Sequence, residues 1–396
     1  MTQIKTDKET IQRIAFRGVE KNFPSDDFLI KKLSSGEKLR IYMGIDPTGP
    51  TLHMGHMVTI KKLSQFQKAG HEVILLIGNF TATIGDPDKK DVRKQLTAEE
   101  VMENAKLYQK QASLYLDFEG ENPAFLKYNK DWLGEMKFED VLNLASKMTV
   151  QQMLQRDMFK RRLDEEKPIY IHEFMYPLMQ GYDSVAMDVD GEVGGNDQTF
   201  NMLAGRTMLK EIKDKEKFVV PMKLLVDPNG NKMGKTTGNM LSLLDSPFEM
   251  FSKIMSWTDG MIMSGFELLT DQNLEEIQKR LDEGENPKNL KTELGKNIVT
   301  FCFSKEKADE AEKNWTLQFS KKEIPDNLEE VEVQKETGIL DILVNLEMVN
   351  SKKEARRKID EGAVYINEQK VDSWDFTPQE DSILKLGKKM KKIILK

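Results

Sequence analysis

The chain has 396 residues, enough for two or three domains and at least one sizeable hydrophobic core. Its longest apolar run, VILLIG near residue 75, is too short to cross a bilayer. The charged start lacks the apolar centre of an export signal, so we expect a cytoplasmic protein without a membrane segment. The single cysteine, Cys302, excludes an internal disulfide and a zinc site built from several cysteines.

The net charge of -7 is unevenly distributed along the chain. Residues 351–396 hold 12 Lys and Arg against 8 Asp and Glu, so the end of the chain is basic and the rest is acidic. An acidic body argues against a protein that coats nucleic acid over its whole surface. A basic end favours one localised contact with a polyanion.

A strand, a turn and a helix are predicted in succession near the start of the chain. Residues 39–45 (LRIYMGI) alternate apolar and other residues, which is typical of a half-buried strand. Residues 46–50 (DPTGP) are rich in residues that interrupt regular structure and predict a tight connection. Thr51 is expected to cap a helix that ends near Gly70 and whose apolar face comprises Met57, Ile60, Leu63 and Phe66.

The next apolar run, EVILLIG at 72–78, is typical of a buried strand. A strand, a helix and a strand at this spacing form a βαβ unit, whose two strands are parallel and lie in one sheet. More alternation of this kind continues to about residue 240. The fold class predicted for this part of the chain is therefore α/β with a parallel sheet.

The rest of the chain changes character twice. VVPMKLLVD at 219–227 predicts a late strand, and SPFE at 246–249 predicts a capping box that begins a helical region. Residues 321–338 contain few large apolar side chains and read as a linker. We therefore predict an α/β domain at 1–240, an α-helical domain at 241–320, a linker at 321–338 and a small separate domain at 339–396.

Two of the four histidines, His53 and His56, lie three positions apart where the first long helix is predicted to begin. Residues at i and i+3 project to the same side of a helix, and the free amides of a helix N-terminus favour an anion. Two imidazoles added there suit phosphate oxygens, and Gly55 between them leaves room for a flat base. The alternative is two incidental surface histidines, which the rarity of the H-x-G-H pattern disfavours.

A second basic motif, NKMGKTTGN at 231–239, follows the predicted late strand. Lys232 and Lys235 have small neighbours, so such a loop can close over a triphosphate and neutralise charge as pyrophosphate leaves. Taken alone, the motif fits a solvated basic turn. Its combination with His53 and His56 favours a phosphate-binding function.

A polar triplet interrupts an otherwise apolar helix predicted in IHEFMYPLMQGYDS at 171–184. Tyr176, Gln180 and Asp183 share one face of that helix, which suits a pocket for a polar ligand better than a core. Shortly afterwards, GGNDQ at 194–198 offers two glycines for close backbone approach. Each stretch by itself is equally compatible with a purely structural role.

The basic end of the chain contains a short predicted helix at 351–362, SKKEARRKIDEG. Ser351 and Glu354 fit a capping box, and Gly362 fits the stop. Five Lys and Arg residues crowd this segment. A solvated charged helix is one interpretation, and a surface for the phosphates of a nucleic acid is the other.

Taken together, these motifs resemble those of a known family. HMGH resembles the first signature of class I aminoacyl-tRNA synthetases and of related nucleotidyltransferases. KMGKT resembles the mobile lysine loop of class I synthetases, with Gly234 where Ser is usual. The helix at 171–184 and GGNDQ resemble the tyrosine-binding helix and ribose-binding loop of bacterial tyrosyl-tRNA synthetases, and that resemblance extends through the tail. It implies a Rossmann-like catalytic domain, an α-helical anticodon-side domain and a small α+β RNA-binding domain named for a ribosomal protein.

The resemblance also implies roles for single residues in binding L-tyrosine. Tyr42 and Asp183 would hydrogen-bond the phenol of the substrate. The ammonium group of the substrate would be held by Asp86, Tyr176 and Gln180, with Thr81 and Gln198 close by.

For ATP, the resemblance implies a second set of residues. The phosphates would be contacted by Thr48, His53 and His56, and the ribose by Gly195 and Asp197. Gly44, Asp46 and Gly55 would line the pocket where tyrosine and ATP meet, and the mobile loop would contribute Lys232, Lys235 and Thr236. The segment GDPDKKDVR at 85–93 departs slightly from its relatives in length, so the residue that reaches pyrophosphate stays open among Lys89, Lys90 and Arg93.

The implied reaction is activation of L-tyrosine by ATP to tyrosyl-AMP and pyrophosphate, with Mg²⁺ accompanying ATP. Transfer of the tyrosyl group to the terminal adenosine of tRNA(Tyr) would follow. No protein metal site is implied. The family further implies a homodimer.

Three alternatives remain at this point. A small-metabolite nucleotidyltransferase would share the HMGH helix but leave KMGKT and the basic tail unexplained. A noncatalytic RNA-binding protein would not need His53, His56, Lys232 and Lys235. A tryptophan-specific relative would share the fold, and against it stand Tyr42 with Asp183 and the tail domain.

Overall fold

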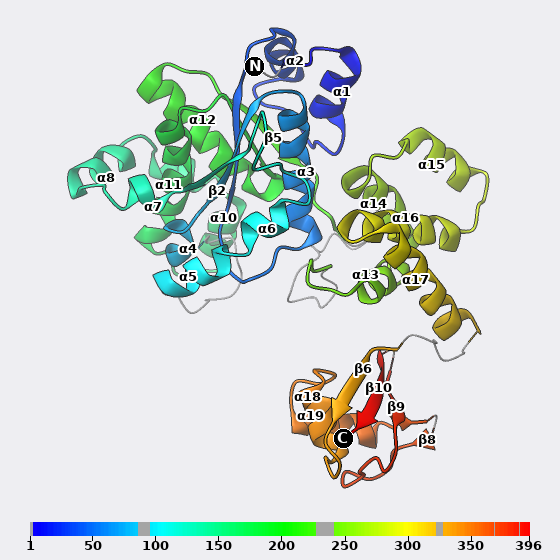
Figure 1. The fold of residues 1–396 in the computed structure, drawn as a ribbon. Helices are drawn as coiled ribbons and strands as arrows, with labels where there is room; N and C mark the ends of the chain where they lie inside the picture. The colour runs from blue at the N-terminus through cyan, green and yellow to red at the C-terminus, as the bar shows by residue number, and fades with distance from the viewer. Residues whose placement is uncertain (1–2, 86–95, 227–240, 322–327, 368, 388) are drawn as a thin grey trace. The chain divides into compact units, whose positions relative to one another are not determined.

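The structure, a computed structural model, describes residues 3–85, 96–226, 241–321, 328–367, 369–387 and 389–396. The chain divides into two compact units, Met1–Glu312 and Lys313–Lys396. Figure 1 shows the first unit as a sheet surrounded by helices with a further group of helices, and the second as a small unit with its own sheet. Each unit is described by itself.

The first unit is built on a five-stranded parallel sheet in the order β3-β2-β1-β4-β5. The strands are β1 (Arg40–Ile45), β2 (Glu72–Ile77), β3 (Phe125–Tyr128), β4 (Gly191–Gly195) and β5 (Phe218–Met222). Helices and the short 3-10 helix η1 connect the strands, and the predicted Rossmann-like α/β fold is confirmed. The helices up to β5 are α1 (Lys8–Phe16), α2 (Asp26–Ser34), α3 (Met54–Lys68), α4 (Thr81–Ile84), α5 (Ala98–Ala105), α6 (Tyr108–Ala112), α7 (Lys130–Leu133), α8 (Phe138–Ala145), α9 (Val150–Met153), α10 (Asp157–Asp164), α11 (Ile171–Met187), η1 (Asn196–Gln198) and α12 (Thr199–Lys213).

The predicted βαβ unit is confirmed as β1, α3 and β2. Strand β2 is apolar after its first residue and is buried there, as expected for a strand covered on both faces. The start of α3 differs from the prediction, because His53 and not Thr51 is its N-cap. Residues 52–54 first pair with residues 241–243, through Met54 N–H to the Leu241 carbonyl (2.9 Å) and Leu243 N–H to the Leu52 carbonyl (3.2 Å). This long-range pairing keeps the chain extended at Leu52 and His53 and delays the helix.

The predicted late strand at 219–227 is shorter than expected. Strand β5 ends at Met222, which lies opposite Gly195, the last residue of the neighbouring strand β4. Beyond this point Lys223 donates its N–H to the carbonyl of Gly18 (2.9 Å) instead of continuing the sheet. The strand therefore ends where its partner strand ends.

The order of the strands places a ligand crevice in a definite position. The chain moves outward from β1 to β2 and β3, and then returns to the other side of β1 with β4 and β5. In open parallel sheets, ligands bind at such a switch point, outside the carboxyl ends of the strands. Here the switch lies between β1 and β4. The residues that follow these strands are 46–50 and 196–198.

The last part of the first unit, from residue 247 onwards, is helical, as predicted. Its elements are α13 (Pro247–Met255), η3 (Asp259–Met261), α14 (Ile262–Leu269), α15 (Leu274–Asp282), α16 (Pro287–Cys302) and the beginning of α17 (Lys305–Trp315). The capping box predicted in SPFE is confirmed, since Ser246 accepts from the Glu249 N–H and the Glu249 carboxylate accepts from the Ser246 N–H. Pro247 occupies the first helical position.

Cations join this helical part to the sheet part. The guanidinium of Arg17 donates to the carbonyls of Phe266, Glu267 and Thr270 at the end of α14, at 3.0–3.3 Å. Lys61 on α3 forms an ion pair with Asp271 (3.1 Å) just beyond that helix. The last carbonyls of a helix lack partners inside the helix, so two cations stabilise its C-terminus.

The second unit is a small α+β structure with its own core. Its sheet has the order β6-β10-β9-β7-β8, and two helices pack beside it. The elements are η4 (Thr316–Lys321), β6 (Glu330–Val333), α18 (Ile339–Asn345), α19 (Lys352–Asp360), β7 (Val364–Ile366), β8 (Gln369–Lys370), β9 (Ser382–Leu386) and β10 (Lys389–Leu395). Ser351 caps α19 as predicted, whereas the Glu354 carboxylate accepts from the Asn350 N–H (2.9 Å).

The prediction of a linker over 321–338 is wrong for Glu330–Val333. These residues form β6, an edge strand that pairs in parallel with β10 and buries Val333 in the core of the second unit. Their Glu-Val-Glu-Val sequence exposes both glutamates, as an edge strand allows. A four-residue strand stabilised by a partner some sixty residues later leaves little local signal.

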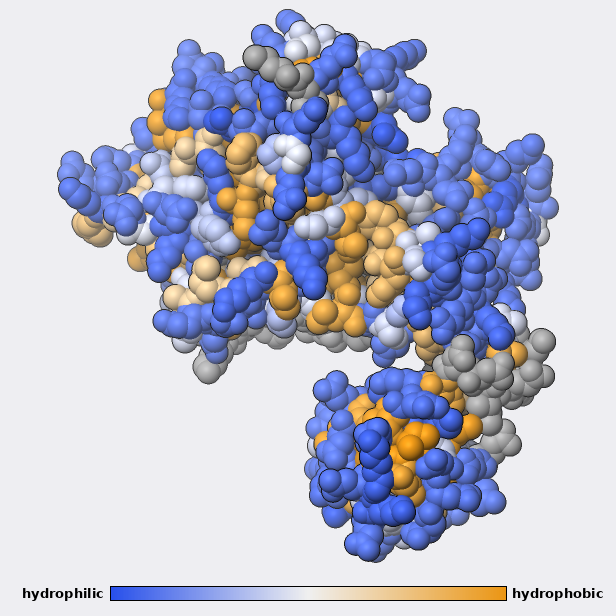
Figure 2. Space-filling view, viewed as in Figure 1, coloured by the Kyte–Doolittle hydropathy of each residue, from blue (hydrophilic) through white to orange (hydrophobic). Residues whose placement is uncertain are grey.

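The surface is mostly polar on the side visible in Figure 2, where hydrophilic residues cover much of each unit. Among the described residues, none of the helices is both long and apolar enough to cross a membrane.

Candidate active site

The middle strand of the sheet carries three of the predicted site residues towards the switch point. Tyr42 and Gly44 lie on β1, and Asp46 follows its carboxyl end. Tyr42 is completely buried, whereas Gly44 is exposed although its strand is central. An exposed residue within a central strand means that the sheet is open beside Gly44, at the place where a ligand is expected.

The carboxylate of Asp46 joins three elements of the site. One oxygen accepts from the hydroxyl of Thr81 (2.7 Å), and the other accepts from the hydroxyl of Tyr176 (2.7 Å). The hydrogen bond between Thr81 and Asp46 requires a glycine at position 78, directly after β2. A Cβ on Gly78 would lie 2.0 Å from Asp46 Oδ1 and 2.4 Å from Thr81 Oγ1. Residues from β1, α4 and α11 are thus brought together at one point.

The polar face predicted in the helix 171–184 exists in α11, and each of its members has partners. Tyr176 donates to Asp46, as described above. Gln180 donates from Nε2 to Glu192 Oε1 on β4 (3.1 Å). Asp183 accepts from the Trp132 indole N–H (2.8 Å) and from the Asn129 amide (3.3 Å). The face therefore points towards β1, β4 and the segment after β3.

Asp183 is a carboxyl group in an unusual environment, with 3% of its surface exposed. Burial raises the pKa of Asp183 well above its usual range, and the hydrogen bonds from Trp132 and Asn129 oppose that rise only in part. Titratable groups perturbed in this way concentrate at functional sites. Asn129 also donates to Thr81 Oγ1 (3.1 Å), so the Asp183 and Asp46 carboxylates belong to one hydrogen-bonded network.

The hydroxyl of Tyr42 lies 3.0 Å from the hydroxyl of Ser184, the neighbour of Asp183 in α11. Burial raises the pKa of Tyr42 well above its usual range, and the nearby Glu192 and Asp183 carboxylates act in the same direction. Tyr42 therefore stays protonated at all ordinary pH values. Its hydroxyl can donate one hydrogen bond and accept another.

The histidine pair lies at the N-terminus of α3, as predicted. The rings of His53 and His56 are stacked, with centroids 3.7 Å apart and planes inclined by 20°. His56 Nδ1 accepts from the backbone N–H of His53 (3.3 Å), which leaves Nε2 of His56 as the atom that carries the proton. A Cβ at Gly55 would lie 2.9 Å from the His53 ring, so this glycine makes room for the imidazole itself.

The turn between β1 and α3 is held from outside by two short helices. Tyr108 on α6 donates its hydroxyl to the Gly49 carbonyl (2.7 Å), and Asn104 on α5 donates to the Pro47 carbonyl (3.1 Å). Thr48 is half-buried within this turn and donates its N–H to the Asp46 carbonyl (2.8 Å). The contacts define the course of the backbone that carries Thr48 towards His53.

Gly195, Asp197 and Gln198 lie at the carboxyl end of β4, on the other side of the switch point. A Cβ at Gly195 would lie 2.5 Å from Asp197 Oδ1, so this glycine permits the turn into η1. Gln198 accepts from the Asn201 amide (2.9 Å), and the same amide donates to Gln180 (3.1 Å). Asn201 therefore connects the loop after β4 to the polar face of α11.

Several predicted site residues lie outside the described residues. They are Asp86, Lys89, Lys90, Arg93, Lys232, Lys235 and Thr236. The chain on either side of the lysine motif is described. Leu224 lies beside Gly195, and the Leu241 carbonyl accepts from the Met54 N–H next to His53.

Sequence reasoning missed a group of residues around the site: the half-buried Trp132 and the buried polar residues Asn129, Ser184, Glu192, Asn201 and Lys217. Ser184, Glu192 and Lys217 lie beneath Tyr42 and Gln180. A charged residue within a short, otherwise apolar strand was an available signal at Glu192, since an unpaired charge there would be costly to bury.

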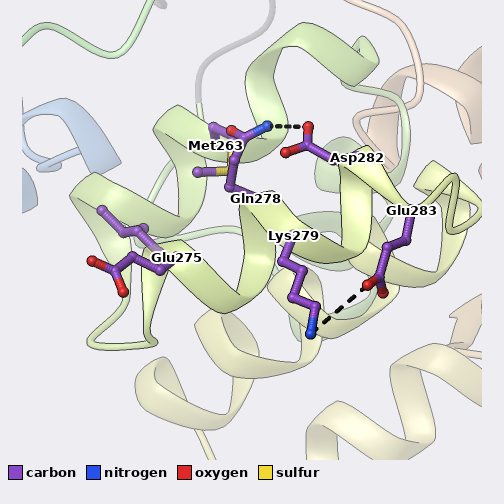
Figure 3. Close-up of a pocket in the computed structure, with 7 residues that line it drawn as sticks. Met263, Glu275, Gln278, Lys279, Asp282 and Glu283 are labelled. Atoms are coloured by element: carbon purple, nitrogen blue, oxygen red, sulfur yellow. Dashed lines mark hydrogen bonds and ion pairs between the residues drawn. The ribbon is translucent and has the colours of Figure 1, made fainter.

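A separate hollow of about 580 Å³ lies on α14 and α15 and contains Met263, Gln278 and Lys279 (Figure 3). Its polar groups pair with one another, through Gln278 to Asp282 (2.8 Å) and Lys279 to Glu283 (3.8 Å). The described site residues lie elsewhere, at the carboxyl ends of β1 and β4. The convergence of buried polar groups there makes that crevice the candidate site.

Comparison with known proteins identifies the family in both units. Residues 34–321 match the family of class I tRNA synthetases (W and Y), and residues 320–390 match the SYY-like C-terminal domain of tyrosine–tRNA ligases. The chain is 44% identical over 393 residues to the tyrosine–tRNA ligase of Carboxydothermus hydrogenoformans, covering 94% of each chain. It is 42% identical over 373 residues to that of Thermotoga maritima, covering 92% of each.

Solved structures with a similar fold include a truncated mitochondrial tyrosyl-tRNA synthetase of Aspergillus nidulans (TM-score 0.65, 22% identity, 79% of this chain and 95% of that chain). Another is the tyrosyl-tRNA synthetase of Archaeoglobus fulgidus (TM-score 0.62, 24% identity, 77% of this chain and 99% of that chain). The sequence relatives, which extend over more than nine-tenths of the chain, confirm the predicted family. The chain therefore belongs to the tyrosine–tRNA ligase family of class I aminoacyl-tRNA synthetases.

Proposed function

We propose that this protein activates L-tyrosine with ATP to tyrosyl-AMP and pyrophosphate and then transfers the tyrosyl group to the terminal adenosine of tRNA(Tyr). The observation that carries the proposal is the buried carboxyl of Asp183, close to Tyr42 at the switch point of the sheet, in a chain of this family. A buried pair of hydroxyl and carboxyl groups suits a ligand with a phenol.

The phenol of L-tyrosine would accept from the Tyr42 hydroxyl and donate to the Asp183 carboxylate. Asp86, Tyr176 and Gln180 are proposed to hold the ammonium group, with Thr81 and Gln198 beside them. The hydrogen bonds from Trp132 and Asn129 to Asp183 support this assignment, because they hold the carboxylate in one orientation. Phenylalanine would leave both phenol partners buried and unpaired, which disfavours its binding.

ATP would lie across the same crevice, with its phosphates at the N-terminus of α3. The positive end of the α3 dipole and the Nε2–H of His56 favour phosphate oxygens there. His53 and Thr48 would complete the phosphate contacts, and Gly55 would line the pocket. The ribose is assigned to Gly195 and Asp197, and Gly44 and Asp46 lie where the two substrates meet.

The chemistry needs no covalent enzyme intermediate. The carboxylate of tyrosine attacks the α-phosphate of ATP, and pyrophosphate leaves. Positioning and the stabilisation of negative charge supply the catalysis. Lys232, Lys235 and Thr236 are proposed to contribute to that stabilisation, as is one of Lys89, Lys90 and Arg93.

Mg²⁺ is expected to accompany ATP. Within the described ranges, no group of three or more His, Cys, Asp and Glu side chains is arranged to hold a metal ion. Both oxygens of Asp46 already accept from hydroxyl groups. We therefore assign no protein ligands to the ion.

The division of labour along the chain is also proposed. Catalysis is assigned to residues 1–240 and contact with the anticodon side of tRNA to 241–320. RNA binding by the tail is assigned to 339–396 together with β6, which belongs to the same sheet. The basic helix α19 would contact phosphates and so contribute affinity and register more than base specificity.

A homodimer in the cytoplasm is the proposed state of the protein. Between residues 138 and 171, six large hydrophobic side chains are more than half exposed: Phe138, Leu142, Val150, Leu163, Tyr170 and Ile171. Exposed apolar side chains concentrated in one stretch favour a protein partner, and a second copy of this chain is the partner we propose. Sedimentation at micromolar concentration should give a dimer, and a monomer would contradict it.

The test of the proposed activity is ATP–pyrophosphate exchange measured with each standard amino acid in turn. Exchange with tyrosine is expected. Exchange with tryptophan alone would keep the fold and mechanism and overturn the assignment of the pocket. No exchange with any amino acid would favour a small-metabolite nucleotidyltransferase or a noncatalytic RNA-binding protein instead.

A further inference from the structure

A lysine and a glutamate form an ion pair in the interior of the first unit. Lys217 is completely buried and Glu192 is 2% exposed, and Lys217 Nζ contacts Glu192 Oε2. Glu192 lies on β4 opposite Tyr42 of β1, and Lys217 directly precedes β5. Burying two charges is costly even when they pair, and apolar residues often stabilise a fold as well. The pair therefore calls for a role besides stability.

The ion pair contacts two of the residues assigned to tyrosine binding. Lys217 Nζ also donates to the Ser184 hydroxyl (2.8 Å), which lies 3.0 Å from the Tyr42 hydroxyl. The other oxygen of Glu192 accepts from Gln180 Nε2 (3.1 Å). Lys217 thus reaches Tyr42 through a single serine, and Glu192 contacts both Gln180 and the Tyr42 hydroxyl directly.

The fold leaves space for this arrangement at a glycine of α12. A Cβ at Gly205 would lie 2.7 Å from Ser184 Oγ and 2.8 Å from Lys217 Nζ. Contacts below 3.0 Å to both groups mean that any side chain at this position would displace the ammonium or the hydroxyl. The absence of a side chain at Gly205 is therefore matched to the position of the Lys217 head group.

The chemistry of the two charged groups sets the direction of the hydrogen bonds around them. An ammonium only donates, so Ser184 Oγ accepts from Lys217 and its own hydrogen remains for Tyr42. Tyr42 then accepts from Ser184, and in the site without substrate its own hydrogen is directed to the Glu192 carboxylate, which can only accept. A carboxylate only accepts, so Glu192 binds the amide nitrogen of Gln180. The amide oxygen of Gln180 then faces Asn201, from which it accepts (3.1 Å).

We propose that Lys217 and Glu192 are positioning residues for amino-acid selection, which keep the Tyr42 hydroxyl a donor that the phenol oxygen of tyrosine takes over from Glu192, and which hold the Gln180 amide in one orientation. The inference rests on the proposed function and deepens it. It predicts that selectivity for tyrosine over phenylalanine depends on two buried residues that touch no substrate. The high pKa of Tyr42 supports this role, because the hydroxyl keeps its hydrogen.

The main test is a double-mutant cycle on the full-length protein, read as kcat/KM for tyrosine and for phenylalanine in ATP–pyrophosphate exchange. Ser184→Ala removes the hydroxyl that joins Lys217 to Tyr42, so Tyr42 loses the donor that makes its oxygen an acceptor, while Lys217 keeps its ion pair with Glu192. The ratio of the two kcat/KM values should fall on the order of tenfold, the effect of losing one hydrogen bond. The loss should appear mainly in KM for tyrosine, and it should vanish when Tyr42→Phe is already present.

A second variant tests the charges themselves. Lys217→Met with Glu192→Gln removes both charges at similar volume, and selectivity should again fall about tenfold in the same Tyr42-dependent manner. Arg206→Met with Glu216→Gln is the matched control, because it removes a half-buried ion pair from α12 and the residue before Lys217. This control should leave the selectivity unchanged.

The outcomes separate this inference from the proposed function. No exchange with tyrosine by the unaltered protein would overturn the proposed function. Exchange with tyrosine, together with unchanged selectivity in the Ser184→Ala protein, would overturn only the inference. The inference would also be overturned if the variants lost kcat/KM equally for tyrosine and phenylalanine and did so in the Tyr42→Phe background as well. That result would mean that the ion pair has a purely structural role. If the charge-free variant does not fold, the Ser184→Ala cycle decides by itself.

Discussion

At the scale of single residues, Asp183 has the most specific environment in the candidate site. Its carboxyl group is buried, has two nitrogen donors and shares a network with Asp46 through Asn129 and Thr81. A carboxylate in such a position can still accept one more strong hydrogen bond. That remaining capacity is what the proposed function uses for the phenol of tyrosine.

The first prediction concerns this carboxylate. Asp183→Asn keeps the size of the side chain but removes its charge and one acceptor. Selectivity for tyrosine over phenylalanine in ATP–pyrophosphate exchange should fall by about 10-fold to 100-fold, the range expected for a hydrogen bond to a buried charged group. Asp188→Asn, at the C-cap of the same helix, is the control and should leave this selectivity unchanged. Undiminished selectivity in the Asp183→Asn protein would show that the phenol binds elsewhere.

A second residue-scale prediction concerns the buried His71. Burial lowers the pKa of His71 from 6.5 to about 4, and its Nδ1 accepts from the Leu39 N–H (3.3 Å). The unfolded chain binds a proton below pH 6.5 but the folded chain does not until about pH 4. Unfolding therefore takes up a proton in this range, and stability should fall as the pH is lowered from 6.5 towards 4.

Urea denaturation at pH 7, 6 and 5 measures this effect. The contribution of one such group reaches at most about 1.4 kcal/mol per pH unit. His71→Asn keeps an acceptor near the Leu39 N–H and cannot be protonated. The free energy of unfolding should therefore fall less steeply in the His71→Asn protein than in the unaltered protein as the pH is lowered. A constant difference from pH 7 to pH 5 would mean that His71 does not titrate as stated.

At the scale of elements, the start of α3 shows how distant pairing changes a local signal. Thr51 is a good cap by itself, and the apolar face of the helix was correctly predicted. The backbone of residues 52–54 pairs with 241–243 instead, so Thr51 stays outside the helix and its hydroxyl lies 3.1 Å from that of Ser242. The shift places His53 at the N-cap, where its stacking with His56 becomes possible.

The contact between α14 and the sheet part supports a third prediction. Arg17→Met should reduce the free energy of unfolding by about 1–3 kcal/mol, because three carbonyls at the end of α14 lose a charged donor. Arg13→Met is the control, since Arg13 is exposed on α1. Equal losses for the two variants in urea denaturation would contradict the assigned role of Arg17.

At the scale of the whole molecule, the chain consists of two compact units, each of which has its own sheet. The core of the second unit is made of its own residues, among them Val333 on β6 and Ile393 on β10. Removing the chain from residue 339 would leave β6 without its partner strand and expose its backbone. A clean removal of the second unit therefore begins before β6.

The fourth prediction follows from that boundary. A chain without residues 328–396 should keep tyrosine-dependent ATP–pyrophosphate exchange within about twofold. It should lose at least about tenfold in tRNA charging, because the phosphate contacts of the tail are gone. Equal loss of both activities would contradict the division of labour between the units.

A milder variant in the full chain tests the same division. Lys353→Gln with Arg356→Gln removes two charges from α19 and should weaken tRNA charging and reduce its dependence on salt. Lys31→Gln with Lys32→Gln on α2 makes the same change in charge outside the second unit. The α2 variant is expected to charge tRNA normally.

The sequence alone was sufficient for the fold class, for the βαβ unit and for the motifs that indicate the family. Periodicity, caps and short motifs act over neighbouring residues, so they are readable without the fold. The capping box at Ser246, the helix around Tyr176 and the histidine pair were all located in this way. The boundaries of α3, β5 and the linker were wrong because distant strands determine them.

Only the tertiary structure decided which polar groups meet. Asp46 and Tyr176 are 130 residues apart in the chain, yet one hydrogen bond joins them. Lys217, Ser184 and Tyr42 likewise come together only because β4 lies between β1 and β5 in the sheet. The order of strands in a sheet depends on the packing of all the connecting helices at once, and a local pattern carries no record of it. A charged residue in an apolar segment reveals that a buried partner is needed, and only the folded chain reveals which one.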